Sequence, residues 1–146
     1  MAENQTEAPP PIQPPPPPTT SAPPPPDPES RARTWNMLCH LSILAGYIIP
    51  FGNFLGPFLI WQIMKNEVPS VETHAKDALN FQFTVLIVLI AGFVIAFILS
   101  FFCIGYLLFP VLGVIALCDI ILPIIAGVKA NNGVAFKYPY TIQFLK

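Results

Sequence analysis

The sequence predicts an all-α polytopic membrane protein, a four-helix bundle of two hairpins that follows a disordered proline-rich tail. Hydrophobic residues make up 53% of the 146 residues and charged residues only 10%, which leaves too little polar surface for a soluble protein of this size. Charged residues divide the chain beyond residue 33 into two long and almost uncharged blocks. Thirteen of the nineteen prolines lie in the first 33 residues. The first two observations predict membrane helices, and the third predicts the tail.

The proline-rich segment, residues 1–33, is expected to be a disordered cytoplasmic tail, and residues 34–146 are expected to form one transmembrane domain. Runs such as PPPIQPPPPP lack most backbone donors and bury little surface, so they favour an extended chain. The repeated PxxP pattern suits a cytoplasmic partner with an aromatic-lined groove, although a plain spacer is the simpler interpretation.

The first uncharged block, residues 34–64, is interrupted by Pro50, Gly52 and Asn53, which are typical of a turn. Its two arms of about 15 residues would each be about 22 Å long as helices, short of the roughly 30 Å of a bilayer core. The block therefore predicts helices over about 35–49 and 54–66, and it leaves open whether this first hairpin crosses the membrane completely.

The second block, residues 78–128, is interrupted only by Asp119 and is more than twice as long as one crossing of about 20 residues requires. It divides near Cys103 and Gly105. This block predicts helices over about 71–101 and 105–130, which form a full-length membrane hairpin.

The positions of the cationic side chains predict the orientation. All seven lie in the tail, the middle loop or the C-terminal segment: Arg31, Arg33, Lys65, Lys76, Lys129, Lys137 and Lys146. The positive-inside rule then places both termini in the cytoplasm and both hairpin tips on the other side of a bacterial cytoplasmic membrane. Trp35, Trp61, Lys76 and Asp77 are expected at the cytoplasmic interface of this multi-pass protein.

The stretch VETHAKDALNFQ, residues 71–82, gathers charged and polar side chains directly before an uncharged run. Thr73, Asp77, Asn80 and Thr84 recur at helical spacing, so they predict one polar stripe that faces protein or water. The stretch also reads as an ordinary helix start, which is the favoured interpretation. The alternative is a metal or acid–base centre, which would combine Glu72, His74 and Asp77 with His40 and which lacks any motif of known mechanism.

Asp119 is a charge about 15 Å along the helix from Lys129, and hence deep in the predicted membrane span. Such a charge costs about 2.5–3.5 kcal/mol on insertion scales, so the side chain must point at another helix. One hypothesis is a proton or ion relay shared with His40, and the favoured one is a carboxyl that only holds helices together. The candidate functional polar residues are His40, Asn80, Gln82 and Asp119.

No catalytic residue, metal site or cofactor is predicted, and the protein is not expected to be an enzyme. Cys39, Cys103 and Cys118 lie in apolar runs without ligand spacing, so they indicate neither a disulfide framework nor a zinc site. A net charge of −1, with no basic cluster, argues against binding to nucleic acid.

Three segments, HLSILAGYIIPFGNFLGPFLIWQIMK, HAKDALNFQFT and GVKANNGVAFKYPYTIQFL, together resemble the Tic-twenty-like family of small four-helix membrane proteins. The resemblance covers about residues 35–145 and includes neither Asp119 nor the tail. It implies a bundle related to a channel-forming component of the chloroplast inner-envelope import machinery, and bacterial members whose activity is open.

The expected function is therefore that of a non-enzymatic integral membrane protein, a subunit or scaffold of a membrane assembly that resembles a protein-translocation component. The alternative is a small channel or a proton or ion conductor that uses Asp119 and His40. Expected partners are the lipid bilayer and other membrane proteins, and the chain is a candidate for a homo-oligomer.

Overall fold

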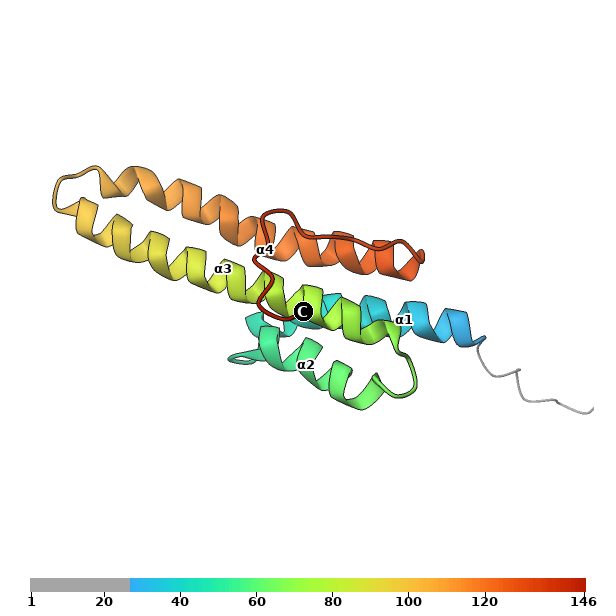
Figure 1. Cartoon of the computed structure of the whole chain (residues 1–146). Helices are drawn as coiled ribbons and strands as arrows, with labels where there is room; N and C mark the ends of the chain where they lie inside the picture. The colour runs from blue at the N-terminus through green and yellow to red at the C-terminus, as the bar shows by residue number, and fades with distance from the viewer. Residues whose placement is uncertain (1–26) are drawn as a thin grey trace, which may run out of the picture.

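The computed structural model describes residues 27–146 (Figure 1). Its elements are α1 (Pro28–Leu41), the 3₁₀ helix η1 (Ser42–Tyr47), α2 (Gly52–Met64), α3 (Ser70–Ser100), the 3₁₀ helix η2 (Gly105–Leu107) and α4 (Leu108–Asn131). Residues 134–146, here called the C-terminal strap, have no regular structure. The prediction of an all-α fold with four helices is confirmed, and residues 27–146 contain no strand. The predicted tail up to residue 26 lies outside the described residues.

The first helix begins earlier than predicted, at Pro28 rather than near residue 35, so the tail boundary at residue 33 is wrong. Proline is tolerated in the first turn because the N–H that it lacks would have no partner inside the helix. The Asp27 side chain caps this turn by accepting a hydrogen bond from the backbone N–H of Glu29. Ion pairs of Arg33 with Glu29 and of Arg31 with Glu67 further stabilise the segment.

The first hairpin consists of α1, η1 and α2, and its predicted first helix over 35–49 is α-helical only as far as Leu41. Its two arms pack very closely, because a Cβ added to Gly56 of α2 would lie 2.7 Å from the Cβ of Ser42 in η1. Phe51 precedes α2 in the left-handed conformation, with φ of 62°, and thereby reverses the chain.

The second hairpin consists of α3 and α4, with bounds close to the predicted 71–101 and 105–130. Among the described residues, the segments Ser70–Ser100 and Gly105–Asn131 are the two that are long and apolar enough to cross a membrane. Only 6% and 17% of the most apolar 18-residue windows of these segments are buried, unlike a helix in the core of a soluble protein. The structure thus supports two membrane-spanning helices rather than four.

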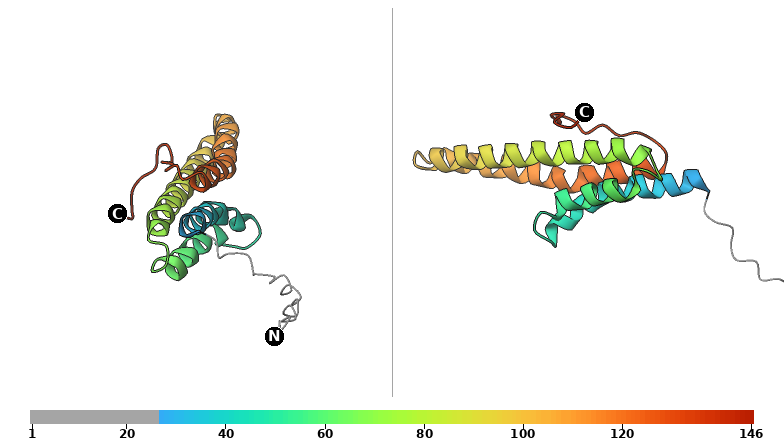
Figure 2. Two further views of the ribbon diagram at one scale, coloured as in Figure 1. Left: turned by 90° about the vertical axis from the view of Figure 1, so that its right-hand side faces the viewer. Right: turned by 60° about the horizontal axis from the view of Figure 1, so that its bottom comes forward.

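The first hairpin flanks only one half of the second (Figures 1 and 2). This half contains the start of α3 and the end of α4, and all cationic residues of the described chain lie in it or in the first hairpin and the strap beside it. We call this part of the molecule the charged end. The other half of the second hairpin, towards the turn at residues 101–104, has exposed apolar side chains such as Phe93, Phe97, Val111 and Val114. A four-helix bundle therefore exists only at the charged end.

The buried core lies where the two hairpins meet. Ile43 of η1, Phe81 of α3 and Ala126 of α4 pack together there with Tyr138 of the strap. A second cluster of Met64, Val68 and Val71 lies at the connection between α2 and α3, and the half-buried Trp35 and Trp61 pack against it.

Candidate functional site: two buried polar networks

The first network centres on His40, which α1 places in the core with no exposed surface. The Nδ1 atom of His40 lies 2.9 Å from the Tyr138 hydroxyl, and its Nε2 atom lies 2.9 Å from Nδ1 of His74. The Tyr138 ring stacks on Phe81, with 4.2 Å between the ring centroids. This network therefore joins α1, α3 and the strap.

Burial governs the protonation of this network. Desolvation, with a smaller contribution from His74, lowers the pKa of His40 from 6.5 to about 3. Burial also raises the pKa of the Tyr138 phenol, with smaller contributions from Cys39, Asp77 and Asp119. At neutral pH the imidazole of His40 and the phenol of Tyr138 are therefore both uncharged hydrogen-bonding groups.

The second network centres on Gln82, whose side chain is almost completely buried in α3. Asn53 of α2 donates to Gln82 Oε1 over 2.8 Å, and Gln82 Nε2 donates to Asp119 Oδ1 of α4 over 2.8 Å. The Tyr47 hydroxyl of η1 donates to Asp119 Oδ2 over 3.1 Å. Both carboxylate oxygens of Asp119 thus have donors, and the tip of the first hairpin is joined to both membrane-spanning helices.

Asn80 holds the end of the strap. Its Nδ2 atom donates to the carbonyl of Leu145 over 2.9 Å, and its Oδ1 atom accepts from the backbone N–H groups of Phe144 and Leu145. One turn further along α3, Thr84 accepts from the N–H of Ile142. The buried amide and hydroxyl thereby satisfy backbone groups of a segment that has no ladder or helix of its own.

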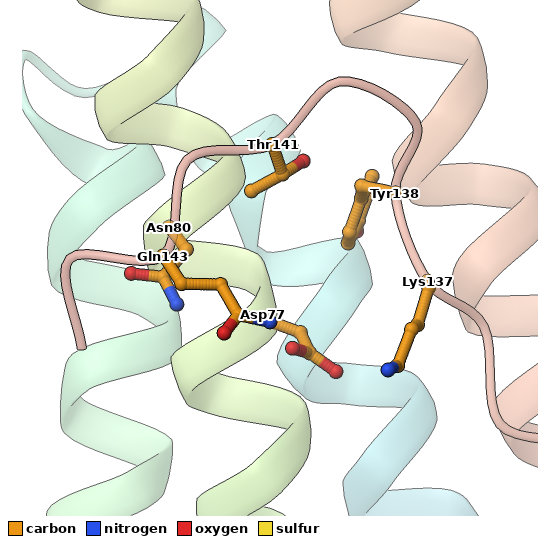
Figure 3. Close-up of a pocket in the computed structure, with 6 residues that line it drawn as sticks. All are labelled: Asp77, Asn80, Lys137, Tyr138, Thr141 and Gln143. Atoms are coloured by element: carbon orange, nitrogen blue, oxygen red, sulfur yellow. The ribbon is translucent and has the colours of Figure 1, made fainter. Parts of the chain in front are cut away.

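The predicted polar stripe faces the strap over most of its length. Asp77 and Asn80 line a small polar cavity of about 50 Å³ together with strap residues (Figure 3). The other lining residues are Lys137, Tyr138, Thr141 and Gln143. Lys137 and Asp77 approach each other across this cavity, as Figure 3 shows. Thr73, at the start of the stripe, is exposed.

The residues of the hypothetical metal or acid–base centre have separate partners. Glu72 forms an ion pair with Lys76 over 2.6 Å, His74 bonds to His40, and Asp77 faces the polar cavity. Among residues 27–146, no group of three or more His, Cys, Asp and Glu side chains could hold a metal ion. The geometry thus favours the interpretation of this stretch as the start of a helix.

The structure does not join His40 to Asp119. The hydrogen bonds of His40 lead to His74 and Tyr138, whereas those of Asp119 lead to Gln82 and Tyr47. Two of the predicted polar residues, Gln82 and Asp119, are in direct contact. The predicted relay between His40 and Asp119 would have to connect two networks that share no hydrogen bond in the described chain.

The four residues predicted at the interface lie at the charged end. Lys76 reaches over Trp61, with 5.7 Å from Nζ to the ring centroid, while it pairs with Glu72. Trp35 packs against the same apolar cluster as Trp61. Long side chains that cover apolar surface and end in a charge are typical of a membrane interface.

Sequence reasoning missed Tyr138, Asn53 and Tyr47, which complete the two networks. Asn53 belongs to the predicted turn of the first hairpin, where a polar residue has an evident local role, and Tyr47 lies just before that turn. Tyr138 lies in the C-terminal segment, beyond the last predicted helix. The only feature of the sequence that could have indicated their role in the networks is that they are polar residues within apolar surroundings.

The comparisons with known proteins overturn the resemblance to the Tic-twenty-like family. A sequence model of the MamF/MmsF family, described as the magnetosome magnetite crystal formation protein family, matches residues 31–145. The comparison with curated proteins and that with solved structures yield no match. All three segments that carried the resemblance lie within residues 31–145. The assignment to an import-channel family was therefore wrong, and the chain belongs to the MamF/MmsF family of magnetosome magnetite crystal formation proteins.

Proposed function

We propose that this protein is a non-enzymatic component of the magnetosome membrane that contributes to magnetite crystal formation by holding other membrane proteins in place. The family match carries the proposal, because residues 31–145 include both hairpins, both polar networks and nearly all of the strap. Its partners are then the surrounding lipid and other proteins of the same membrane, including further copies of this chain.

The use of the buried polar side chains supports a structural role. Each hydrogen bond of the two networks connects different elements of the chain, and both oxygens of the Asp119 carboxylate accept from side chains of other elements. Such interhelical hydrogen bonds fix the relative positions of helices in lipid, where apolar packing alone distinguishes poorly between arrangements. A rigid charged end offers a defined surface to neighbouring proteins.

The charge distribution supports an orientation. All cationic residues of the described chain lie at the charged end, and the two hairpin tips carry no charge. By the positive-inside rule the charged end faces the cytoplasm, and the turn of the second hairpin, near Cys103, faces the compartment that contains the crystal.

The experiment is removal of the protein from a magnetite-forming bacterium, with electron microscopy of the crystals as the readout. We expect smaller or fewer crystals, with recovery when the wild-type chain is supplied and weaker recovery with Gln82→Leu, which disrupts the second network. The exposed Gln62→Leu is the matched control and should restore the crystals fully. Unchanged crystals after removal would contradict the proposed function.

A second candidate function is a small proton or ion conductor. The supporting observation is the hydrogen-bonded series Asn53, Gln82, Asp119 and Tyr47, which includes an ionisable group on a membrane-spanning helix. Purified protein in liposomes that contain a pH-sensitive dye tests this candidate. Flux that Asp119→Asn abolishes would favour conduction over scaffolding, whereas flux equal to that of protein-free liposomes would exclude it.

A further inference from the structure

An apolar cavity lies beneath the turn of the strap. It has a volume of about 400 Å³ and is lined by α3, α4 and the strap, through Phe81, Thr84, Val85, Val88, Ile115, Cys118, Leu122, Pro139 and Tyr140. The Thr84 hydroxyl is already occupied, because it donates to the carbonyl of Asn80 and accepts from the N–H of Ile142. The cavity therefore offers apolar contacts and very few polar ones.

The position of the cavity identifies the kind of molecule that can fill it. The cavity opens between the two membrane-spanning helices, and Val88 on its wall is 41% exposed. In a bilayer this opening faces hydrocarbon. An unfilled apolar void loses the dispersion contacts of its lining, so an acyl chain from the surrounding lipid is the natural occupant.

The rim of the cavity lies at the depth of the lipid headgroups. The strap has irregular backbone here, and such backbone is not tolerated in contact with hydrocarbon. Tyr140, at the turn of the strap, is 98% exposed and has a φ of 56°. A fully exposed tyrosine in this position is typical of the polar boundary of a membrane.

Cationic side chains lie close along the chain to this rim. Within residues 27–146, the ion pairs use Arg31, Arg33 and Lys76. The cations without an ion pair in the described chain include all three on the last turn of α4 and the strap, namely Lys129, Lys137 and Lys146. Asp77 faces Lys137 and reduces the positive charge there, but the strap with the end of α4 remains positive (Figure 3).

We propose that the cavity beneath the strap binds one acyl chain of an anionic phospholipid, whose phosphate is held by the strap lysines, with Lys137 as the main contact. The apolar lining selects a lipid chain, and the lysines select a negative headgroup. The site does not depend on the proposed role in crystal formation, because either could exist without the other.

The test measures lipid that remains bound to the full chain. The protein is extracted from vesicles of equal parts phosphatidylglycerol and phosphatidylcholine, and native mass spectrometry counts the retained lipids. We expect the wild-type chain to retain phosphatidylglycerol in preference. Val88→Trp, which fills the cavity, should lose this lipid, whereas Val94→Trp is the matched control, because Val94 is an exposed valine of the same helix that does not line the cavity.

A second variant tests the headgroup contact. Lys137→Gln should reduce the preference for phosphatidylglycerol about fivefold, the factor equivalent to about 1 kcal/mol for one basic residue at an anionic surface. The circular dichroism of each variant in detergent establishes that it is folded. Equal retention of both lipids by the wild-type chain, or undiminished retention by folded Val88→Trp, would overturn the proposal.

Discussion

Gln82 is the residue on which the contact between the two hairpins depends most. Its amide accepts from Asn53 and donates to Asp119, and the side chain is almost completely buried. Gln82→Leu would leave Asn53 Nδ2 and Asp119 Oδ1 without their partner, at a cost of roughly 1–3 kcal/mol for each group that is left unsatisfied. We expect a lower thermal midpoint in detergent, measured by circular dichroism. The exposed Gln62→Leu should change it little, and equal midpoints for the two variants would show that the network does not stabilise the fold.

His40 gives the stability of the domain a dependence on pH. Burial keeps the imidazole neutral in the folded chain by lowering its pKa from 6.5 to about 3. Because the pKa of His40 is lower in the folded than in the unfolded chain, the free energy of unfolding has its full value above pH 6.5. It declines as the pH falls, by up to about 1.4 kcal/mol per pH unit for one proton. Unfolding in detergent between about pH 7 and 5, where ordinary carboxylates stay ionised, should show this decline. The slope should be weaker in His40→Gln, and an undiminished slope would contradict the assignment.

Single residues were only partly predictable from the sequence. The polar stripe through Asp77, Asn80 and Thr84 was evident from helical spacing, and so was the need for Asp119 to have a partner. The identities of the partners were not evident, because His40 and Tyr138 are 98 positions apart and meet only through the path of the strap. Helical periodicity describes one face of one helix and contains no information about a distant irregular segment.

At the scale of elements, the packing of α2 on η1 requires a residue without a side chain at Gly56. A Cβ at this position would lie 2.7 Å from both the Cβ and the carbonyl oxygen of Ser42. Gly56→Ala should therefore separate the arms of the first hairpin, destabilising the protein by about 1–3 kcal/mol. The change is measured as the free energy of unfolding in detergent.

Gly113→Ala provides the comparison for this substitution. No atom lies within 4 Å of a Cβ added to Gly113 of α4, so only helix propensity changes there. Alanine is favoured over glycine by about 1 kcal/mol in a helix, and we expect a neutral or slightly stabilised protein. Equal destabilisation by the two substitutions would mean that close packing is not the reason for Gly56.

The sequence predicted the elements better than their contacts. Both long helices were placed within a few residues, because uncharged runs of this length have few other structures available. The start of α1 was missed, because Pro28, which begins this helix, follows directly on the prolines that predicted the tail. The first hairpin contacts only one half of the second. The extent of this contact is determined by side-chain packing, which apolar composition alone does not specify.

At the scale of the whole molecule, the native Cys103 reports on the orientation. Cys103 is exposed in the turn between α3 and α4, at the end opposite to the cationic residues. In intact magnetosomes, a membrane-impermeant maleimide should leave Cys103 unmodified until the membrane is lysed. A cysteine introduced by Lys146→Cys should react at once, with the modified residue identified by mass spectrometry. Reaction of Cys103 in intact magnetosomes would reverse the proposed orientation.

The family of the molecule was the least predictable property. The resemblance to the Tic-twenty-like family rested on three segments in which polar, aromatic, glycine and proline residues interrupt apolar runs, whereas the chain matches the MamF/MmsF family over residues 31–145. Features of this kind follow from the demands of any small helical membrane protein. They predict the architecture well and the biological role poorly.

The short first hairpin also gives the molecule a taper. Four helices lie on the charged side of the membrane and only two on the opposite side, since the first hairpin accompanies only half of the second (Figure 2). The protein thus takes up more lateral area on one side of the bilayer, and a membrane that bends away from that side relieves the imbalance. We expect a higher protein density in small than in large vesicles, with the charged end on the convex surface. The enclosed compartment would then lie on the concave side, where a vesicle holds its contents.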